Sequence, residues 1–204
     1  MTTRLARAGL ILLWLLAGCA SVPPQSPLAG IAGEVRQPYG AIDLGGRLSV
    51  RSQKNGREEA IHGSFSWSQR GDRTLVTLLS PLGQTLATID IAPMTSTLTQ
   101  AGLPTLTAAD PNKLATDALG WPLPVAGLRD WLQGIAIDAA GKRLSASPAS
   151  STAIVTSDGW HLQYPSWDTS GPAGAHPKRI DLSRSTAQAG EVAIRIVIDS
   201  WQPI

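Results

Sequence analysis

The sequence predicts a mainly β fold, a single curved antiparallel sheet that carries a short helical insert. Beyond Gly45, apolar and polar residues alternate with a period of two over several runs, which is typical of strands with one buried face. Turn residues separate these runs at hairpin spacing. In the middle of the chain the period changes, and the pair Asp110-Pro111 marks the start of a helix.

The chain opens with the features of an export signal. Arg4 and Arg7 precede the apolar run 10–16, and small residues follow it. This run is far shorter than the ~20 apolar residues that a membrane-spanning helix requires, so we expect residues 1–18 to be removed. Residues 19–43 begin with a stretch rich in Pro and Ser and are predicted to form a lipidated N-terminus and flexible tether.

The segment Leu16-Ala17-Gly18-Cys19 is typical of the processing box of bacterial lipoproteins. In such a box the thiol takes a diacylglycerol and the freed amine can be acylated, and two or more chains anchor a protein stably. Ala20 stands where an Asp would signal retention in the inner membrane, which favours the outer membrane. The alternative is a buried or free cysteine behind an ordinary signal. Cys19 is the only cysteine, which excludes an intrachain disulfide.

The charge balance argues against nucleic acid as a partner. Removing Arg4 and Arg7 from the 17 basic residues leaves 15, against 15 acidic ones. No cluster of Lys and Arg remains that would follow a phosphate backbone.

The domain predicted for residues 44–204 begins with strands. Leu48 and Val50 alternate with polar neighbours, as do Phe65 and Trp67. A polar turn is expected at 70–73, and Pro81 and Gly83 mark a second turn at 80–83. Further strands are expected at 74–79, 84–91, 96–100, 152–156, 159–164, 178–183 and 191–201.

Two short helices are expected between the halves of the sheet. In the first, Asp110 is the N-cap, Pro111 takes the first helical position and Gly120 follows the end. The second is expected over residues 125–133, with Gly134 as its stop.

No motif indicates catalysis. His62, His161 and His176 are far apart in the sequence, and none belongs to a metal-ligand spacing. A nucleophile elbow and a phosphate-binding glycine loop are both missing. Folding could still bring remote residues together. We interpret His62 and His161 as solvent-facing strand residues, and we expect neither an enzyme nor a cofactor or metal.

The tryptophans allow two interpretations. Trp67, Trp160 and Trp201 either pack in a filled core or line a cavity. Trp121 and Trp131 lie on or beside a short helical segment flanked by Pro and Gly, which suits a movable lid. The alternative is an ordinary helix packed on the sheet.

Leu82 lies between Pro81 and Gly83, at a turn that faces solvent. A large apolar side chain there suggests contact with lipid or a partner, although a single exposed leucine is common.

Several segments together resemble the LolB family, outer-membrane lipoproteins that receive other lipoproteins from the periplasmic carrier LolA. The resemblance covers nearly all of the chain from about Gly46. Its most specific part is Pro122-Leu123-Pro124 followed by Leu128-Arg129-Asp130-Trp131-Leu132-Gln133-Gly134. The other parts are the processing box, Trp67-Ser68-Gln69, Leu78-Leu79-Ser80-Pro81-Leu82-Gly83, Gly120-Trp121, Gly159-Trp160 and Trp201.

The resemblance implies an open, unclosed β-barrel with short helices as a lid over an apolar cavity for acyl chains. It gives Leu82 a role in membrane contact during delivery. The family's helix before the first strand is expected to be short or missing, because residues 34–43 contain Pro38 and Gly40. The cavity or lid residues implied are Trp67, Trp121, Leu128, Trp131, Leu132, Trp160 and Trp201.

The implied partners are a LolA-like carrier, the acyl chains of lipoproteins and outer-membrane lipid, and we expect a monomer. Two alternatives remain. One is a lipid-anchored protein of the same fold that binds lipid or another apolar ligand without a carrier. The other is a structural or assembly lipoprotein with a filled core.

Overall fold

The computed structural model describes residues 36–54, 57–150, 153–171, 174–186 and 190–204. Cys19, the predicted export signal and most of the predicted tether lie outside this part of the chain. The strands are β1 (Ala41–Lys54), β2 (Arg57–Arg70), β3 (Arg73–Leu79), β4 (Thr85–Ala92), β5 (Thr95–Thr99), β6 (Leu106–Ala108), β7 (Ile135–Ile137), β8 (Arg143–Ser145), β9 (Ile154–Val155), β10 (His161–Asp168), β11 (His176–Thr186) and β12 (Gly190–Pro203). The helices are α1 (Pro111–Leu119) and α2 (Val125–Trp131).

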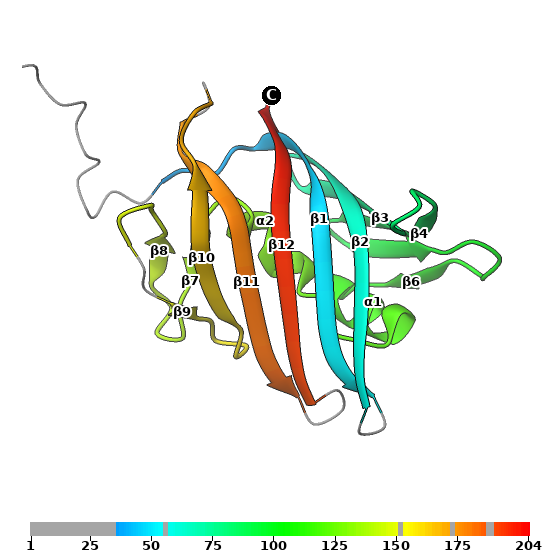
Figure 1. The fold of residues 1–204 in the computed structure, drawn as a ribbon. Helices are drawn as coiled ribbons and strands as arrows, with labels where there is room; N and C mark the ends of the chain where they lie inside the picture. The colour runs from blue at the N-terminus through cyan, green and yellow to red at the C-terminus, as the bar shows by residue number, and fades with distance from the viewer. Residues whose placement is uncertain (1–35, 55–56, 151–152, 172–173, 187–189) are drawn as a thin grey trace, which may run out of the picture. The chain divides into compact units, whose positions relative to one another are not determined.

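Ten of these strands form one antiparallel sheet in the order β6-β5-β4-β3-β2-β1-β12-β11-β10-β9. The first and last strands in the chain's order, β1 and β12, pair at its middle, and the long strands run side by side in Figure 1. The end strands β6 and β9 do not pair with each other, so the sheet is unclosed. The mainly β, open antiparallel fold predicted from the sequence is confirmed.

Residues that alternate in the sequence lie on opposite faces of this sheet. In β12, Val192, Ile194, Ile196 and Ile198 are buried, whereas Arg195 between them is exposed. We call the face that carries these buried residues the inner face and the opposite one the outer face. Alternating side chains point to opposite faces of a strand, so one set can enter the core while the other faces water.

Close backbone approaches accompany the irregular pairing at the centre of the sheet. The β1–β12 register shifts between Gly45 and Gly46, which pair with Ser200 and Ile198. A Cβ atom on Gly46 would lie 2.1 Å from the carbonyl oxygen of Val197. Only glycine fits there, and such an irregularity bends the strand and increases its twist.

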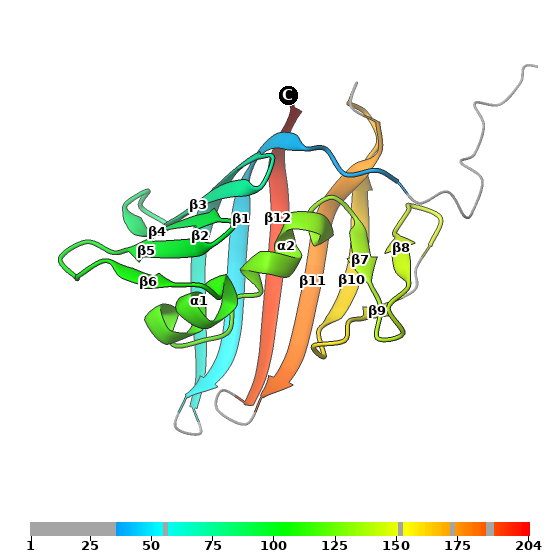
Figure 2. The same cartoon turned by 180° about the vertical axis from the view of Figure 1, so that it is seen from behind.

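Both helices lie on the inner face (Figure 2). The expected caps of α1 are confirmed: the Asp110 side chain accepts hydrogen bonds from the backbone N–H groups of Asn112 and Lys113, and Gly120 has φ +79°. Helix α2 ends at Trp131, two residues earlier than expected. The turn that follows closes with Gly134, whose φ is +76°, a conformation that favours glycine.

Other differences from the sequence-based expectation are local. Strand β1 begins at Ala41 rather than near residue 44, and residues 36–40 form no helix. The short strands β6, β7 and β8 were not predicted, because each has three residues and exists only by pairing with a neighbour. Among the described residues, neither helix is long and apolar enough to cross a membrane.

Candidate functional site: an apolar cavity beneath α2

A small cavity lies between the inner face of the sheet and the segment that contains α2. Its volume is about 20 Å³, and every residue that lines it is apolar. A space of this size holds roughly one water molecule, and with no polar partner such a space stays dry. The lining consists of Leu48, Phe65, Trp67, Val76, Leu78, Leu123, Val125, Leu128, Leu132, Ile194 and Ile196.

Two periodicities bring these residues together. The sheet contributes inner-face residues from β1, β2, β3 and β12, which recur at every second position. The covering segment contributes Val125, Leu128 and Leu132, whose spacing of three and four residues places them on one side of a helix. The cavity therefore lies where the apolar side of α2 faces the apolar side of the strands.

The end of α2 is tied to the sheet by buried amide groups. The Gln133 side chain accepts a hydrogen bond from the Tyr39 backbone N–H (2.7 Å) and donates one to the Arg129 carbonyl (3.2 Å). Gln69 of β2 donates to the Tyr39 carbonyl at 3.3 Å. Gln69 and Gln133 are both buried, so these hydrogen bonds satisfy polar groups that would otherwise be costly to bury.

Further polar contacts hold α2 along its length. The Tyr164 hydroxyl donates to the Trp131 carbonyl at 3.1 Å, and burial raises the pKa of this phenol, which keeps it a neutral donor. Arg129 donates to the Gly71 carbonyl. At the first turn, the backbone N–H of Ala126 donates to the Asn112 side chain at 3.0 Å, and the N-cap residue, Pro124, makes no side-chain hydrogen bond to the helix.

The structure places the seven predicted cavity and lid residues in three groups. Trp67, Leu128 and Leu132 line the cavity in this conformation. Trp121 and Trp131 are buried in the covering segment beside it, but they are not part of the lining.

The other two predicted residues, Trp160 and Trp201, lie away from the lining. Trp160, just before β10, is buried and packs against Trp131, with ring centroids 6.5 Å apart. Trp201, near the end of β12, is half-buried and stacks on His176 at 4.5 Å. Trp160 is therefore part of the hydrophobic core, and Trp201 packs against that core.

Sequence reasoning did not single out most of the lining residues. Leu48, Phe65 and Ile194 belong to alternating runs that were recognised as strands, but alternation only assigns a residue to a face. No local signal distinguished them from inner-face residues elsewhere in the sheet. The position of α2 makes that distinction.

Leu82 occupies the turn between β3 and β4 and is 87% exposed. The Ser80 side chain accepts hydrogen bonds from the backbone N–H groups of Leu82 (3.3 Å) and Gln84 (3.2 Å). The turn therefore has its own internal bonding, and it holds the leucine outward.

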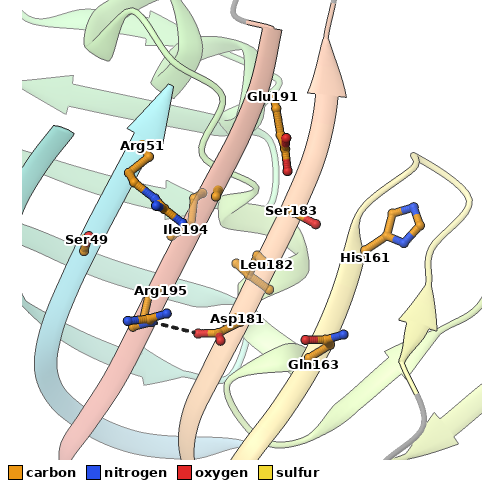
Figure 3. A pocket seen from close by; sticks show the side chains of 11 residues that line it. Ser49, Arg51, His161, Gln163, Asp181, Leu182, Ser183, Glu191, Ile194 and Arg195 are labelled. Carbon is orange, nitrogen blue, oxygen red and sulfur yellow. Dashed lines mark hydrogen bonds and ion pairs between the residues drawn. The ribbon is translucent and has the colours of Figure 1, made fainter. Parts of the chain in front are cut away.

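A larger hollow of about 510 Å³ lies on the outer face, across β1, β12, β11 and β10. Figure 3 shows Arg195 directed at Asp181, at 3.2 Å, while His161 lies apart from both. Burial opposes ionisation of Asp181, but hydrogen bonds from Arg179 and Arg195 outweigh it and lower the pKa of this carboxyl. The hollow is polar and contains both signs of charge, unlike the cavity beneath α2.

The histidines are not gathered into a reactive site. His62 and His161 are exposed, as expected, whereas His176 is buried against Trp201. Within the described ranges, no group of three or more His, Cys, Asp and Glu residues could hold a metal ion.

Comparison with known proteins identifies a family model and curated relatives that share one description. A family model described as outer membrane lipoprotein LolB matches residues 41–201. The chain is 37% identical to the outer-membrane lipoprotein LolB of Cupriavidus necator over 189 residues, which cover 93% of this chain and 92% of that protein. It is also 37% identical to that of Cupriavidus taiwanensis over 193 residues, with the same coverage. Among solved structures, the LolA superfamily protein NE2245 from Nitrosomonas europaea has a TM-score of 0.47 and 9% identity over 85% of this chain and 90% of that one.

Proposed function

This chain belongs to the LolB family of outer-membrane lipoproteins, which serve as receptors in lipoprotein localisation, and from that membership we propose that the cavity beneath α2 receives the acyl chains of incoming lipoproteins. The receptor role is non-enzymatic. Its cargo is a lipoprotein that arrives by way of LolA.

The observation that carries the proposal is the wholly apolar lining of the space beneath α2 in a protein of this family. Acyl chains bind to apolar surface because each CH₂ group removed from water contributes about 0.8 kcal/mol. Transfer from a carrier needs no energy source if the chains pass from one dry environment to another. The final environment, the bilayer, holds them better still.

The cavity has to enlarge before it can hold an acyl chain. A cavity of about 150 Å³ is needed for a molecule as small as benzene, whereas the present space is about 20 Å³. We therefore assign this structure to a closed form. Displacement of α2 from the sheet would expose the inner-face residues beneath it, such as Phe65 and Ile196.

The distribution of polar contacts favours opening from the first turn of α2. The end of the helix is held by Gln133, and Tyr164 bonds to the Trp131 carbonyl. The first turn has a single described side-chain bond, from the Ala126 N–H to Asn112, and apolar contacts through Val125. Trp121 and Trp131 would move with this segment as parts of the lid.

The anchor and the delivery step complete the proposal. Cys19 would carry the lipid that tethers the protein, with residues 1–18 removed and residues 19–43 as the N-terminal tether. Leu82, exposed at its turn, would contact the membrane when cargo is delivered.

The test is transfer of a radiolabelled lipoprotein from purified carrier to this protein, compared between two matched variants. Leu128→Asn places an amide in the cavity lining, and Leu75→Asn makes the same change at an exposed position on β3. We expect Leu128→Asn to reduce acceptance at least about tenfold, because the amide must then be desolvated against an acyl chain, and Leu75→Asn to leave it unchanged. Circular dichroism checks that both variants fold.

A second measurement separates the proposal from a filled core. An apolar fluorescent probe should bind the full chain with a stoichiometry of one, and lipoprotein should displace it. Absence of binding would support the filled-core alternative. Binding without acceptance from the carrier would support the alternative of a protein that binds lipid or another apolar ligand independently.

A further inference from the structure

Two neighbouring turns expose leucines at the same end of strands β3 to β6. The β3–β4 turn presents Leu82, and the β5–β6 turn presents Leu103, which is 59% exposed. Strand β4 pairs with β3 on one side and β5 on the other, and both views of the fold show the two turns projecting in the same direction (Figures 1 and 2). At a strand spacing of about 4.8 Å, turns separated by two spacings lie roughly 10 Å apart.

The turn that carries Leu103 is stabilised by its own polar groups. The Leu103 backbone N–H donates to the Gln100 carbonyl at 3.3 Å, and the Thr99 and Thr105 hydroxyls lie 3.4 Å apart. Gly102, with φ +74°, sets the reversal of the chain. The leucine is thus held outward by a formed turn, as Leu82 is.

The two turns share an uncharged composition. Residues 80–86 and 100–106 contain no charged residue. Leu86 and Leu106, at the starts of the strands that leave these turns, are exposed as well. We call Leu82, Leu86, Leu103 and Leu106 the apolar edge.

The opposite end of the same strands provides the contrast. The β4–β5 turn exposes Met94, which at 86% is as accessible as Leu82. Charged groups lie near it: Arg73 and Asp90 form an ion pair at 2.5 Å, and Asp72 stands in the adjacent β2–β3 turn. The two ends therefore differ in the number of exposed leucines and in the ion pair beside Met94; at the leucine end, Pro81 borders a hollow that Arg47 and Arg195 also line.

We propose that the turn carrying Leu103 is a second membrane contact, so that the apolar edge enters the bilayer surface at two points. The proposal rests on the proposed function, because it assumes delivery at the membrane. Lipid is the occupant that the chemistry favours: apolar side chains can enter the acyl region, and the neutral Gln and Thr groups beside them can bond to headgroups. Two points of contact would also restrict the orientation of the sheet more than a single leucine does.

The experiment uses the full-length lipoprotein in vesicles of phosphatidylethanolamine and phosphatidylglycerol. Leu82→Cys, Leu103→Cys and Met94→Cys each introduce one thiol, which is labelled with a fluorophore; Cys19, once lipidated, does not react. Nitroxide groups placed high on the lipid acyl chains serve as quenchers. We expect the labels at 82 and 103 to be quenched at least about threefold more than the label at 94, because interfacial side chains enter only the outermost part of the acyl region.

Each other outcome overturns the inference. Quenching at 82 alone would leave Leu82 as a single contact, and equal quenching at all three positions would mean unspecific adsorption. Protection of the label at 103 by added carrier, in place of quenching by lipid, would make this turn a protein contact.

A delivery assay separates this inference from the proposed function. We expect Leu103→Glu to accept cargo normally and to insert it into vesicles at least about fivefold more slowly, because a charge at the interface opposes entry into lipid. Met94→Glu is the matched control and should change neither step. If the unmodified protein fails to accept cargo, the proposed function is wrong; if it delivers cargo and Leu103→Glu delivers equally fast, only the inference about Leu103 is wrong.

Discussion

The inner and outer faces of this sheet carry opposite chemistry on the same strands. The inner face is apolar and closes over a space of about 20 Å³. The outer face bears a hollow of about 510 Å³, in which Arg195 pairs with Asp181. The chemistry of the lining, and not the volume, distinguishes these two hollows. The small cavity has a uniformly apolar lining beneath α2, whereas the large hollow is a charged depression in a curved sheet.

The largest predicted effect tests whether the inner face contributes more to stability than the outer face. The test changes neighbouring residues of β12 that point to opposite faces. Ile196→Ala removes buried volume, and we expect it to lower the free energy of unfolding by about 2–5 kcal/mol. Arg195→Ala removes an exposed ion pair and should cost less than about 1 kcal/mol. Urea denaturation measures both. Equal losses would show that the inner face is not the main source of stability.

A smaller effect is expected at the end of α2, where the side chain of Gln133 is buried. Gln133→Ala removes the hydrogen bonds that join the end of α2 to Tyr39, which should cost about 1–3 kcal/mol because Gln133 is buried. The variant should also bind an apolar probe faster, since α2 is less restrained. Stopped-flow fluorescence measures the rate, and Gln163→Ala on the outer face is the control. An unchanged rate would mean that this end of α2 does not limit opening.

The smallest expected effect is the pH dependence of stability that Asp181, on the outer face, contributes. The arginines around Asp181 hold its pKa below the ordinary value, so its contribution to stability is present above about pH 4 and is lost as the pH falls through the folded-state pKa. Because solvent screens this group, we expect at most about 1 kcal/mol. Denaturation of Asp181→Asn across this range should show a shallower loss than that of the unmodified chain. Identical pH profiles would contradict the prediction.

Much of the fold was predictable because it depends on residues close together in the chain. The alternation of Val192, Ile194, Ile196 and Ile198 assigns them to one face, and the structure buries all four. Asp110 and Gly120 cap α1 as predicted. The predicted second helix runs two residues beyond the end of α2, because the apolar spacing continues through Leu132 into the turn.

The site was less predictable because it depends on contacts between distant segments. The sequence by itself determined the order of the longer strands and the two helices, the alternation that forms the inner face, the exposure of Leu82 and the resemblance to a lipoprotein family. Tertiary structure alone decided where α2 lies on that face, and therefore that Phe65 and Ile194 line the cavity while Trp160 does not. It also brought the turns of Leu82 and Leu103 together through pairing with β4. Periodicity records which side of a strand is buried, but the partner that covers it is set by packing across the whole chain.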